Sequence, residues 1–176
     1  DTLIVTDAAI NIAPDLDVKR DIVQNAIDLW VKVGMGTPRV AILSAVETVT
    51  SKMPSTIEAA ALCKMADRGQ ITGGILDGPL AFDNAIDPEA ARIKGIKSEV
   101  AGHAQILVVP NLEAGNMLAK NLIFLSKADA AGLVLGARVP IILTSRADSV
   151  RTRMASCAIA SLFANARRSS TALPAA

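Results

Sequence analysis

Short runs of β-branched and other apolar residues alternate along the chain with longer segments in which apolar and polar residues are mixed. In the longer segments, apolar residues recur every three or four positions, which is the spacing of one helix face. The short runs are almost continuously apolar, and this is typical of strands buried on both faces. We expect strands at residues 3–6, 39–43, 74–76, 105–109, 133–135 and 140–144. We expect helices at residues 16–33, 55–67, 83–93, 112–129 and 148–167, the third of them interrupted near Pro88.

Local signals mark several ends of these elements. Asp15 precedes the first helix and can accept a hydrogen bond from its free N–H groups. Residues 55–58 read Ser-Thr-Ile-Glu, which matches a capping box and predicts the start of the second helix. The sequence Asp77-Gly78-Pro79 predicts a turn that ends the third strand. Either Asp148 or Ser149 can cap the last helix.

The alternation of strands and helices predicts an α/β fold in three layers, with helices on both faces of a mostly parallel sheet. The last two predicted strands are close enough in sequence to form a hairpin across Gly136. In parallel sheets, ligands bind beyond the carboxyl ends of the strands. The candidate binding segments are therefore those that follow strands, at residues 7–14, 44–56, 77–84 and 145–149.

Composition excludes several classes of protein. Of the 176 residues, 51% are hydrophobic, which is too many for a disordered chain and enough for a buried core. The 18 basic and 17 acidic residues leave a net charge of +1, which argues against a general binder of nucleic acid or other polyanions. No apolar run approaches the roughly 20 residues that span a bilayer.

Residues of the common catalytic and metal sites are scarce. His103 is the only histidine, and its place just before a strand favours a loop residue over a catalytic base. Cys63 and Cys157 lie in apolar helical stretches, so we expect buried thiols and not nucleophiles. No cluster of cysteine and histidine has the spacing of a zinc site. Gly34 and Gly36 precede a strand instead of following one, so they do not form a dinucleotide-binding loop.

Three arginines, Arg146, Arg151 and Arg153, surround the N-terminus of the last predicted helix. Free N–H groups at such a terminus bind anions, and the helix dipole disfavours cations there. A bound phosphate or diphosphate and a solvated basic face both explain the cluster. In the long polar loop after the second strand, Glu47 and Lys52 face the same rim.

Several motifs, taken in order, resemble those of the phosphate acetyl/butyryltransferases, also called phosphotransacylases. The resemblance runs from Leu3 to about Ala164. The matching motifs are Thr6-Asp7-Ala8-Ala9-Ile10-Asn11, Val46-Glu47 with Lys52-Met53-Pro54, Ile75-Leu76-Asp77-Gly78-Pro79-Leu80 with Asp83-Asn84-Ala85, Ala101-Gly102-His103-Ala104, Val109-Pro110-Asn111-Leu112-Glu113-Ala114-Gly115-Asn116, and Ser145-Arg146-Ala147-Asp148-Ser149. The second and third of these look most like the butyryl branch and like the module of bifunctional enoyl-CoA hydratase/phosphate acetyltransferase proteins.

The resemblance implies a reversible transfer of an acetyl or butyryl group between CoA and inorganic phosphate. It implies small-molecule substrates (CoA, phosphate and acyl phosphate) and no metal or redox cofactor. It also implies a two-domain fold like that of isocitrate and isopropylmalate dehydrogenases, with the active site in the cleft between the domains. The expected state is a cytoplasmic homodimer without a nucleic-acid or membrane partner.

Residue roles follow from the same resemblance. Arg146 is expected to hold the acyl phosphate, and Ser145 to polarise its carbonyl group. In well-known acetyl enzymes, a carboxylate six residues beyond the arginine takes the thiol proton. Thr152 occupies that position here, so Asp148 is the substitute candidate, although helix capping explains it equally well. The expected substrate-binding residues are Glu47, Lys52, Asp77, Asn116, Arg151 and Arg153; for Asp77, a simple turn residue is the alternative.

The resemblance further implies that this sequence is about half of a two-domain enzyme. Residues 1–128 are expected to form the second, cleft-forming domain, residues 129–168 a return segment of the first domain, and residues 169–176 a flexible tail. Such a fragment is expected to be inactive or weakly active alone. Two alternatives stay open: a metal- and nucleotide-dependent dehydrogenase of the same fold, and a non-catalytic CoA-binding module of a larger fusion protein.

Overall fold

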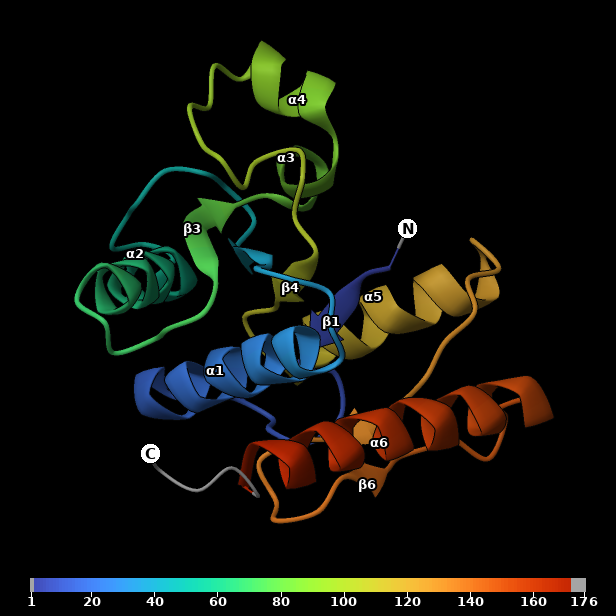
Figure 1. Ribbon diagram of the computed structural model, residues 1–176. Helices are drawn as coiled ribbons and strands as arrows, with labels where there is room; N and C mark the ends of the chain where they lie inside the picture. The colour runs from blue at the N-terminus through green and yellow to red at the C-terminus, as the bar shows by residue number, and fades with distance from the viewer. Residues whose placement is uncertain (1, 172–176) are drawn as a thin grey trace.

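A four-stranded parallel sheet forms the centre of the chain in the computed structural model, which describes residues 2–171 (Figure 1). Its strands are β1 (Ile4–Thr6), β2 (Arg39–Leu43), β3 (Ile75–Leu80) and β4 (Ile106–Val108). They are arranged in the order β1-β4-β2-β3, and every neighbouring pair is parallel. The predicted parallel sheet is therefore confirmed, with β4 and β2 in the middle.

Helices cover both faces of this sheet, as the continuous apolar strands predict. One face packs against α1 (Leu16–Lys32) and α2 (Pro54–Asp67), with Val40 and Ile42 of β2 in the shared core. The other face packs against α3 (Phe82–Ile86), α4 (Pro88–Ile93) and α5 (Leu112–Phe124), with Ala41 and Leu43 in the core. Because successive side chains of a strand point to opposite faces, one apolar strand contributes to both cores.

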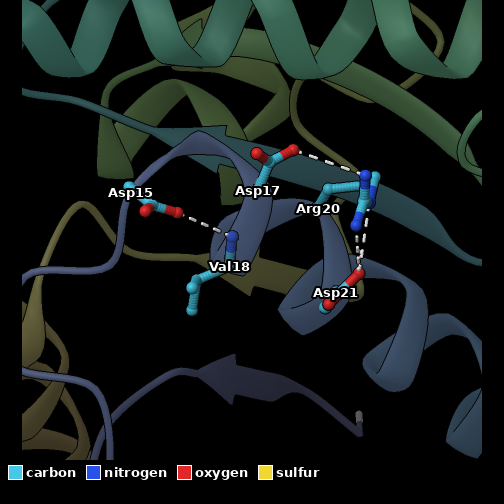
Figure 2. A network of polar contacts seen from close by, with 5 residues as sticks. All are labelled: Asp15, Asp17, Val18, Arg20 and Asp21. Atoms are coloured by element: carbon cyan, nitrogen blue, oxygen red, sulfur yellow. Dashed lines mark hydrogen bonds and ion pairs between the residues drawn. The ribbon is translucent and has the colours of Figure 1, made fainter.

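The first turn of α1 shows how local sequence begins a helix (Figure 2). The Asp15 carboxylate accepts a hydrogen bond from the Val18 N–H at 2.9 Å, which confirms the predicted cap. Arg20 lies between Asp17 and Asp21, with its guanidinium nitrogens 3.4 Å and 3.0 Å from their carboxylates. These pairs are exposed and add little to stability. A further ion pair, between the buried Lys19 and Glu58, joins α1 to α2.

The last part of the chain forms a separate unit of structure beside α1. Strands β5 (Leu133–Val134) and β6 (Ile141–Ile142) pair antiparallel in a small second sheet, which confirms the predicted hairpin. Helix α6 (Val150–Thr171) packs on α1, and its buried Phe163 ring lies 5.8 Å from the Lys32 ammonium. In Figure 1, α6 and β6 lie below α1, which separates them from the parallel sheet.

Two predicted element ends are wrong. Helix α2 begins at Pro54, and the Thr56 hydroxyl donates to the Met53 carbonyl at 2.8 Å, so residues 55–58 do not form a capping box. Strand β3 continues through the predicted turn to Leu80. A Cβ on Gly78 would lie only 2.8 Å from the Ile42 carbonyl oxygen, so glycine here allows β3 to lie against β2. Packing between strands therefore overrides the local turn signal.

The observed C-terminal ends of two helices, α5 and α6, also differ from the predicted ones. Helix α5 stops at Phe124 and not at 129, and beyond its C-cap Leu125 the backbone of Lys127 is left-handed with φ 57°. The Lys127 ammonium also donates to the Phe124 carbonyl at 2.8 Å. Helix α6 continues through Thr171, so the first residues of the predicted tail are helical, and residues 172–176 lie outside the described part of the chain. No helix within residues 2–171 is long and apolar enough to cross a membrane.

The two cysteines differ from one another. Burial, together with the nearby carboxylates of Asp77 and Asp67, raises the pKa of Cys63 to about 12, so this thiol stays protonated and is a poor nucleophile. The Cys63 thiol donates to the Gly78 carbonyl at 3.7 Å. Cys157 is exposed, so the prediction that it is buried is wrong.

The core position Leu62 gives a test of the packing. We expect Leu62→Ala to destabilise the chain by about 2–5 kcal/mol, because this side chain is fully buried between α2 and the sheet. Ile57 lies on the same helix with 47% of its surface exposed, and Ile57→Ala should change stability by no more than about 0.5 kcal/mol. Urea unfolding of both variants measures the difference, and equal shifts would contradict the packing of α2.

Candidate functional site

Parallel pairing brings the carboxyl ends of β1, β2, β3 and β4 to one edge of the sheet. The segments that begin there start at Asp7, Ser44, Ala81 and Val109. Three of the four predicted binding segments therefore reach this edge. The fourth, at residues 145–149, follows β6 of the second sheet and belongs to a different part of the molecule.

The Asp7 carboxylate organises the loop that follows β1. It accepts hydrogen bonds from the backbone N–H groups of Ala9, Ile10 and Asn11 at 2.9, 3.0 and 2.8 Å, and from the Asn11 amide at 2.7 Å. Burial by itself raises the pKa of Asp7, but these hydrogen bonds to the charged form outweigh burial and lower it. The carboxylate is thus charged at neutral pH and occupied in holding its own loop.

The start of α5 packs directly on this loop. The Asn111 side chain caps α5 by accepting from the Ala114 N–H at 3.0 Å, and Asn116 donates to the Ala8 carbonyl at 3.2 Å. A Cβ on Gly115 would lie 2.7 Å from the Asp7 carbonyl oxygen, so only glycine permits this approach. Asn116, a predicted substrate-binding residue, therefore lies at the carboxyl edge, where its amide also fixes the Asp7 loop.

A second polar cluster lies at the same edge. Glu47, from the loop after β2, accepts from the Asn84 amide at 3.3 Å and pairs with the Lys94 ammonium at 3.5 Å. Lys94 also pairs with Asp83 at 3.1 Å, and this contact lowers the pKa of Asp83 and raises that of Lys94. Sequence patterns do not single out Lys94, because it lies in a short exposed helix end; Asn84 appears only within a family motif.

The other predicted residues near this edge stay apart from the cluster. The loop at residues 44–56 is held in shape by the buried Thr56, which is not one of the predicted residues; its hydroxyl accepts from the Thr50 N–H at 2.9 Å. Lys52 is exposed on the same loop. Asp77 lies inside β3 and not in a turn, and its carboxylate accepts from the Gly78 N–H at 2.8 Å. Neither side chain forms a hydrogen bond or ion pair with Glu47 within residues 2–171.

The predicted catalytic residues form a tight turn before α6. The Ser145 N–H donates to the Asp148 carboxylate at 2.5 Å, and the Asp148 N–H donates to the Ser145 carbonyl at 3.1 Å. Ser149, and not Asp148, caps the helix by accepting from the Thr152 N–H at 3.1 Å. Arg146 is exposed. The turn therefore holds Ser145 and Asp148 together and presents Arg146 to solvent.

The other two arginines of the predicted anion site are also exposed. Arg151 pairs with Asp129 at 2.6 Å, which reduces its availability for an anion, while Arg153 extends from the first turn of α6. No hydrogen bond or ion pair in the described chain links residues 145–153 to Glu47, Lys52, Asp77 or Asn116. The structure thus shows two groups of predicted site residues, one on each sheet. Among residues 2–171, no three His, Cys, Asp or Glu side chains are grouped to hold a metal ion.

Comparison with known proteins decides the family. A family model described as "Phosphate acetyl/butaryl transferase" matches residues 1–161. The chain belongs to this family. This confirms the resemblance that the motifs carry and leaves the same-fold dehydrogenase without support.

Relatives of this transferase family match over most of the chain. The phosphate acetyltransferase of Rhizobium meliloti is 83% identical over 168 residues, which are 96% of this chain and 53% of that protein. The phosphate butyryltransferase of Clostridium acetobutylicum is 48% identical over 162 residues, which are 92% of this chain and 54% of that protein. The chain spans about half the length of the curated relatives it matches.

A solved structure supports the same fold. The branched-chain phosphotransacylase from Enterococcus faecalis V583 aligns with a TM-score of 0.83 at 36% identity, covering 90% of this chain and 56% of that one. The mostly parallel α/β architecture of this chain is therefore that of phosphotransacylase structures.

The Asp7 loop gives a pH-dependent test. The Asp7 pKa in the folded chain lies below its unfolded value, so the carboxylate stabilises the fold above about pH 4 and this contribution is lost as the pH falls through the folded-state pKa. We expect Asp7→Asn to lower the free energy of unfolding by about 1 kcal/mol at pH 7, since the loop is partly exposed. The difference from the wild type should shrink below about pH 4.

Urea unfolding between pH 7 and pH 3 measures this difference. Asp17→Asn is the matched control, because Asp17 is exposed on α1 and its removal should matter by no more than about 0.5 kcal/mol. A deficit of Asp7→Asn that stays constant over this pH range would show that the charge of Asp7 does not stabilise the loop.

Proposed function

We propose that the protein to which this chain belongs transfers an acyl group, acetyl or butyryl, reversibly between CoA and inorganic phosphate: acyl-CoA and phosphate give acyl phosphate and CoA. The observation that carries this proposal is the match of the phosphate acetyl/butyryltransferase family over residues 1–161, together with 83% identity to a phosphate acetyltransferase. CoA is a substrate in this reaction, and the chemistry requires no metal or redox cofactor.

The turn at residues 145–148 has the residue types that this reaction needs. The CoA sulfur attacks the carbonyl carbon of the acyl phosphate, a C–S bond forms, and the C–O bond to phosphate breaks. Arg146 is free to hold the phosphoryl oxygens and to stabilise the leaving phosphate. The Ser145 hydroxyl donates a hydrogen bond to the carbonyl oxygen as negative charge develops there. Asp148, held by the Ser145 N–H, accepts the thiol proton through its other oxygen.

We assign the two groups of site residues to two walls of one cleft. Residues 1–128, which contain the parallel sheet, form the second domain of a fold like that of isocitrate and isopropylmalate dehydrogenases. This domain supplies Glu47, Lys52, Asp77 and Asn116. Residues 129–168 return to the first domain and supply the Ser145 turn with Arg151 and Arg153. Two observations support this division: β5 and β6 form a sheet of their own, and the chain spans about half of its relatives.

The same proposal covers the working state of the protein. We expect a cytoplasmic homodimer whose partners are small molecules, without a nucleic-acid or membrane partner. The described chain alone should be inactive or weakly active, because one wall of the cleft is incomplete. A non-catalytic CoA-binding module is the alternative, and it differs by binding CoA without forming thioester.

The assay is CoA-dependent phosphate release from acetyl phosphate and butyryl phosphate by the full-length protein. We expect thioester formation with the wild type, and a loss of at least about 100-fold in kcat/KM for Arg146→Ala, because a charged clamp on the transition state is removed. Arg68→Ala is the control, since Arg68 is exposed at the end of α2, at the opposite edge of the sheet.

Each arm of the assay has a contrary outcome. Wild-type protein that binds CoA but forms no thioester would support the non-catalytic module instead. A mild effect of Arg146→Ala, similar to that of Arg68→Ala, would place Arg146 outside the active site.

A further inference from the structure

Asn84 is the third residue of α3 and is fully buried, yet its polar groups are only half used. Its amide nitrogen donates to Oε2 of Glu47 at 3.3 Å. Within residues 2–171, its amide oxygen is buried and lacks a hydrogen-bond partner. Turning the amide over would point this oxygen at the Glu47 carboxylate, and the two would repel, so the contact with Glu47 determines the orientation of the side chain.

The backbone around Asn84 keeps the side chain in this place. The Asn84 carbonyl accepts from the Gly102 N–H at 2.8 Å. Gly102 itself lies so close to Pro88 that a Cβ would be 2.5 Å from the Pro88 Cα. The amide of Asn84 is therefore a rigid donor, fixed by surrounding backbone, that meets a half-exposed carboxylate from another loop.

An unpaired buried acceptor destabilises a fold, and an apolar side chain of the same shape avoids this penalty. Leucine has nearly the shape of asparagine and carries no polar group that would be left unpaired there. Residues that lower the stability of the fold, and that no packing requirement explains, are typical of functional sites. The contact that Asn84 does make is with Glu47, so any function of Asn84 operates through that carboxylate.

The Oε1 atom of Glu47 can accept a hydrogen bond from a ligand that carries N–H or O–H groups. Both contacts of Glu47 in the described chain are made by Oε2, with Asn84 and with Lys94, which leaves Oε1 as an acceptor at the carboxyl edge. Lys94 is shared with Asp83, so two carboxylates face one ammonium and the cluster does not attract an anion. Phosphate and acyl phosphate are anions with few or no donors, whereas the pantetheine part of CoA carries two amide N–H groups and a hydroxyl.

We propose that Asn84 is a positioning residue, which holds Glu47 so that its free oxygen accepts a hydrogen bond from the pantetheine part of CoA. This inference rests on the function proposed above and adds a division of labour to it. The cluster of Glu47, Asn84 and Lys94 recognises CoA, and it takes no part in holding phosphate.

The test is steady-state kinetics of the full-length protein, with KM measured separately for CoA and for acetyl phosphate, alongside thermal unfolding. We expect Asn84→Leu to raise the KM for CoA about tenfold, the equivalent of one charge-assisted hydrogen bond, with an unchanged KM for acetyl phosphate. Its Tm should be equal to or above that of the wild type. Glu47→Gln changes a half-exposed side chain without disturbing the core, and it should raise the KM for CoA in the same selective way.

Glu89→Gln is the matched control, because Glu89 is an exposed carboxylate on α4 that pairs only with Arg92 in the described chain. It should leave both KM values unchanged. If the wild type is active and neither Asn84→Leu nor Glu47→Gln alters the KM for CoA, the assignment is wrong while the proposed function stands. Equal rises in both KM values, or a lower Tm with Asn84→Leu, would make Asn84 a structural residue and also overturn it. Wild-type protein without transferase activity would overturn the proposed function and this inference together.

Discussion

The parallel pairing of β4 with both β1 and β2 dictates where the helices and the loops of this chain can lie. Ile106 of β4 pairs with Ile4 on one side and with Val40 on the other. Strands in the middle of such a sheet have both faces buried, so helices must cover both sides, and two separate apolar cores result. Together with the parallel pairing of β3 with β2, this pairing of β4 also sends the ends of all four strands to one edge, where the loops after β1, β2, β3 and β4 begin.

Close backbone packing completes that edge. At Gly115, α5 approaches the Asp7 loop so closely that no larger residue fits, and at Gly78 β3 approaches β2 in the same way. The Asp7 carboxylate then supplies the acceptors that the loop backbone needs. Rigid backbone at the edge is what allows side chains such as Asn84 and Glu47 to meet with defined geometry, and preorganised polar groups of this kind bind substrates with little loss of conformational freedom.

The two groups of site residues differ in charge and in origin. Carboxylates outnumber ammonium groups around Glu47, Asp83 and Lys94, whereas arginines dominate the turn and first helical turn at residues 146–153. In our proposal, this difference matches the two parts of the reaction: neutral amide donors of CoA on one wall, and phosphoryl oxygens on the other. A cleft with walls of unlike charge would orient the two substrates before they react.

Features that depend on residues close together in the chain could be predicted from the sequence. The spacing of apolar residues predicted α1 and β2, and the position of Asp15 predicted the cap of α1. The order of the motifs along the chain pointed to the family. The end of β3 could not be predicted in this way, because packing against β2 keeps residues 77–79 in the strand despite their turn signal. The contacts of Glu47 with Asn84, 37 residues away in the sequence, and with Lys94 likewise come from the tertiary structure. Contacts of that separation depend on how the sheet brings loops together, and no local pattern of residues encodes them.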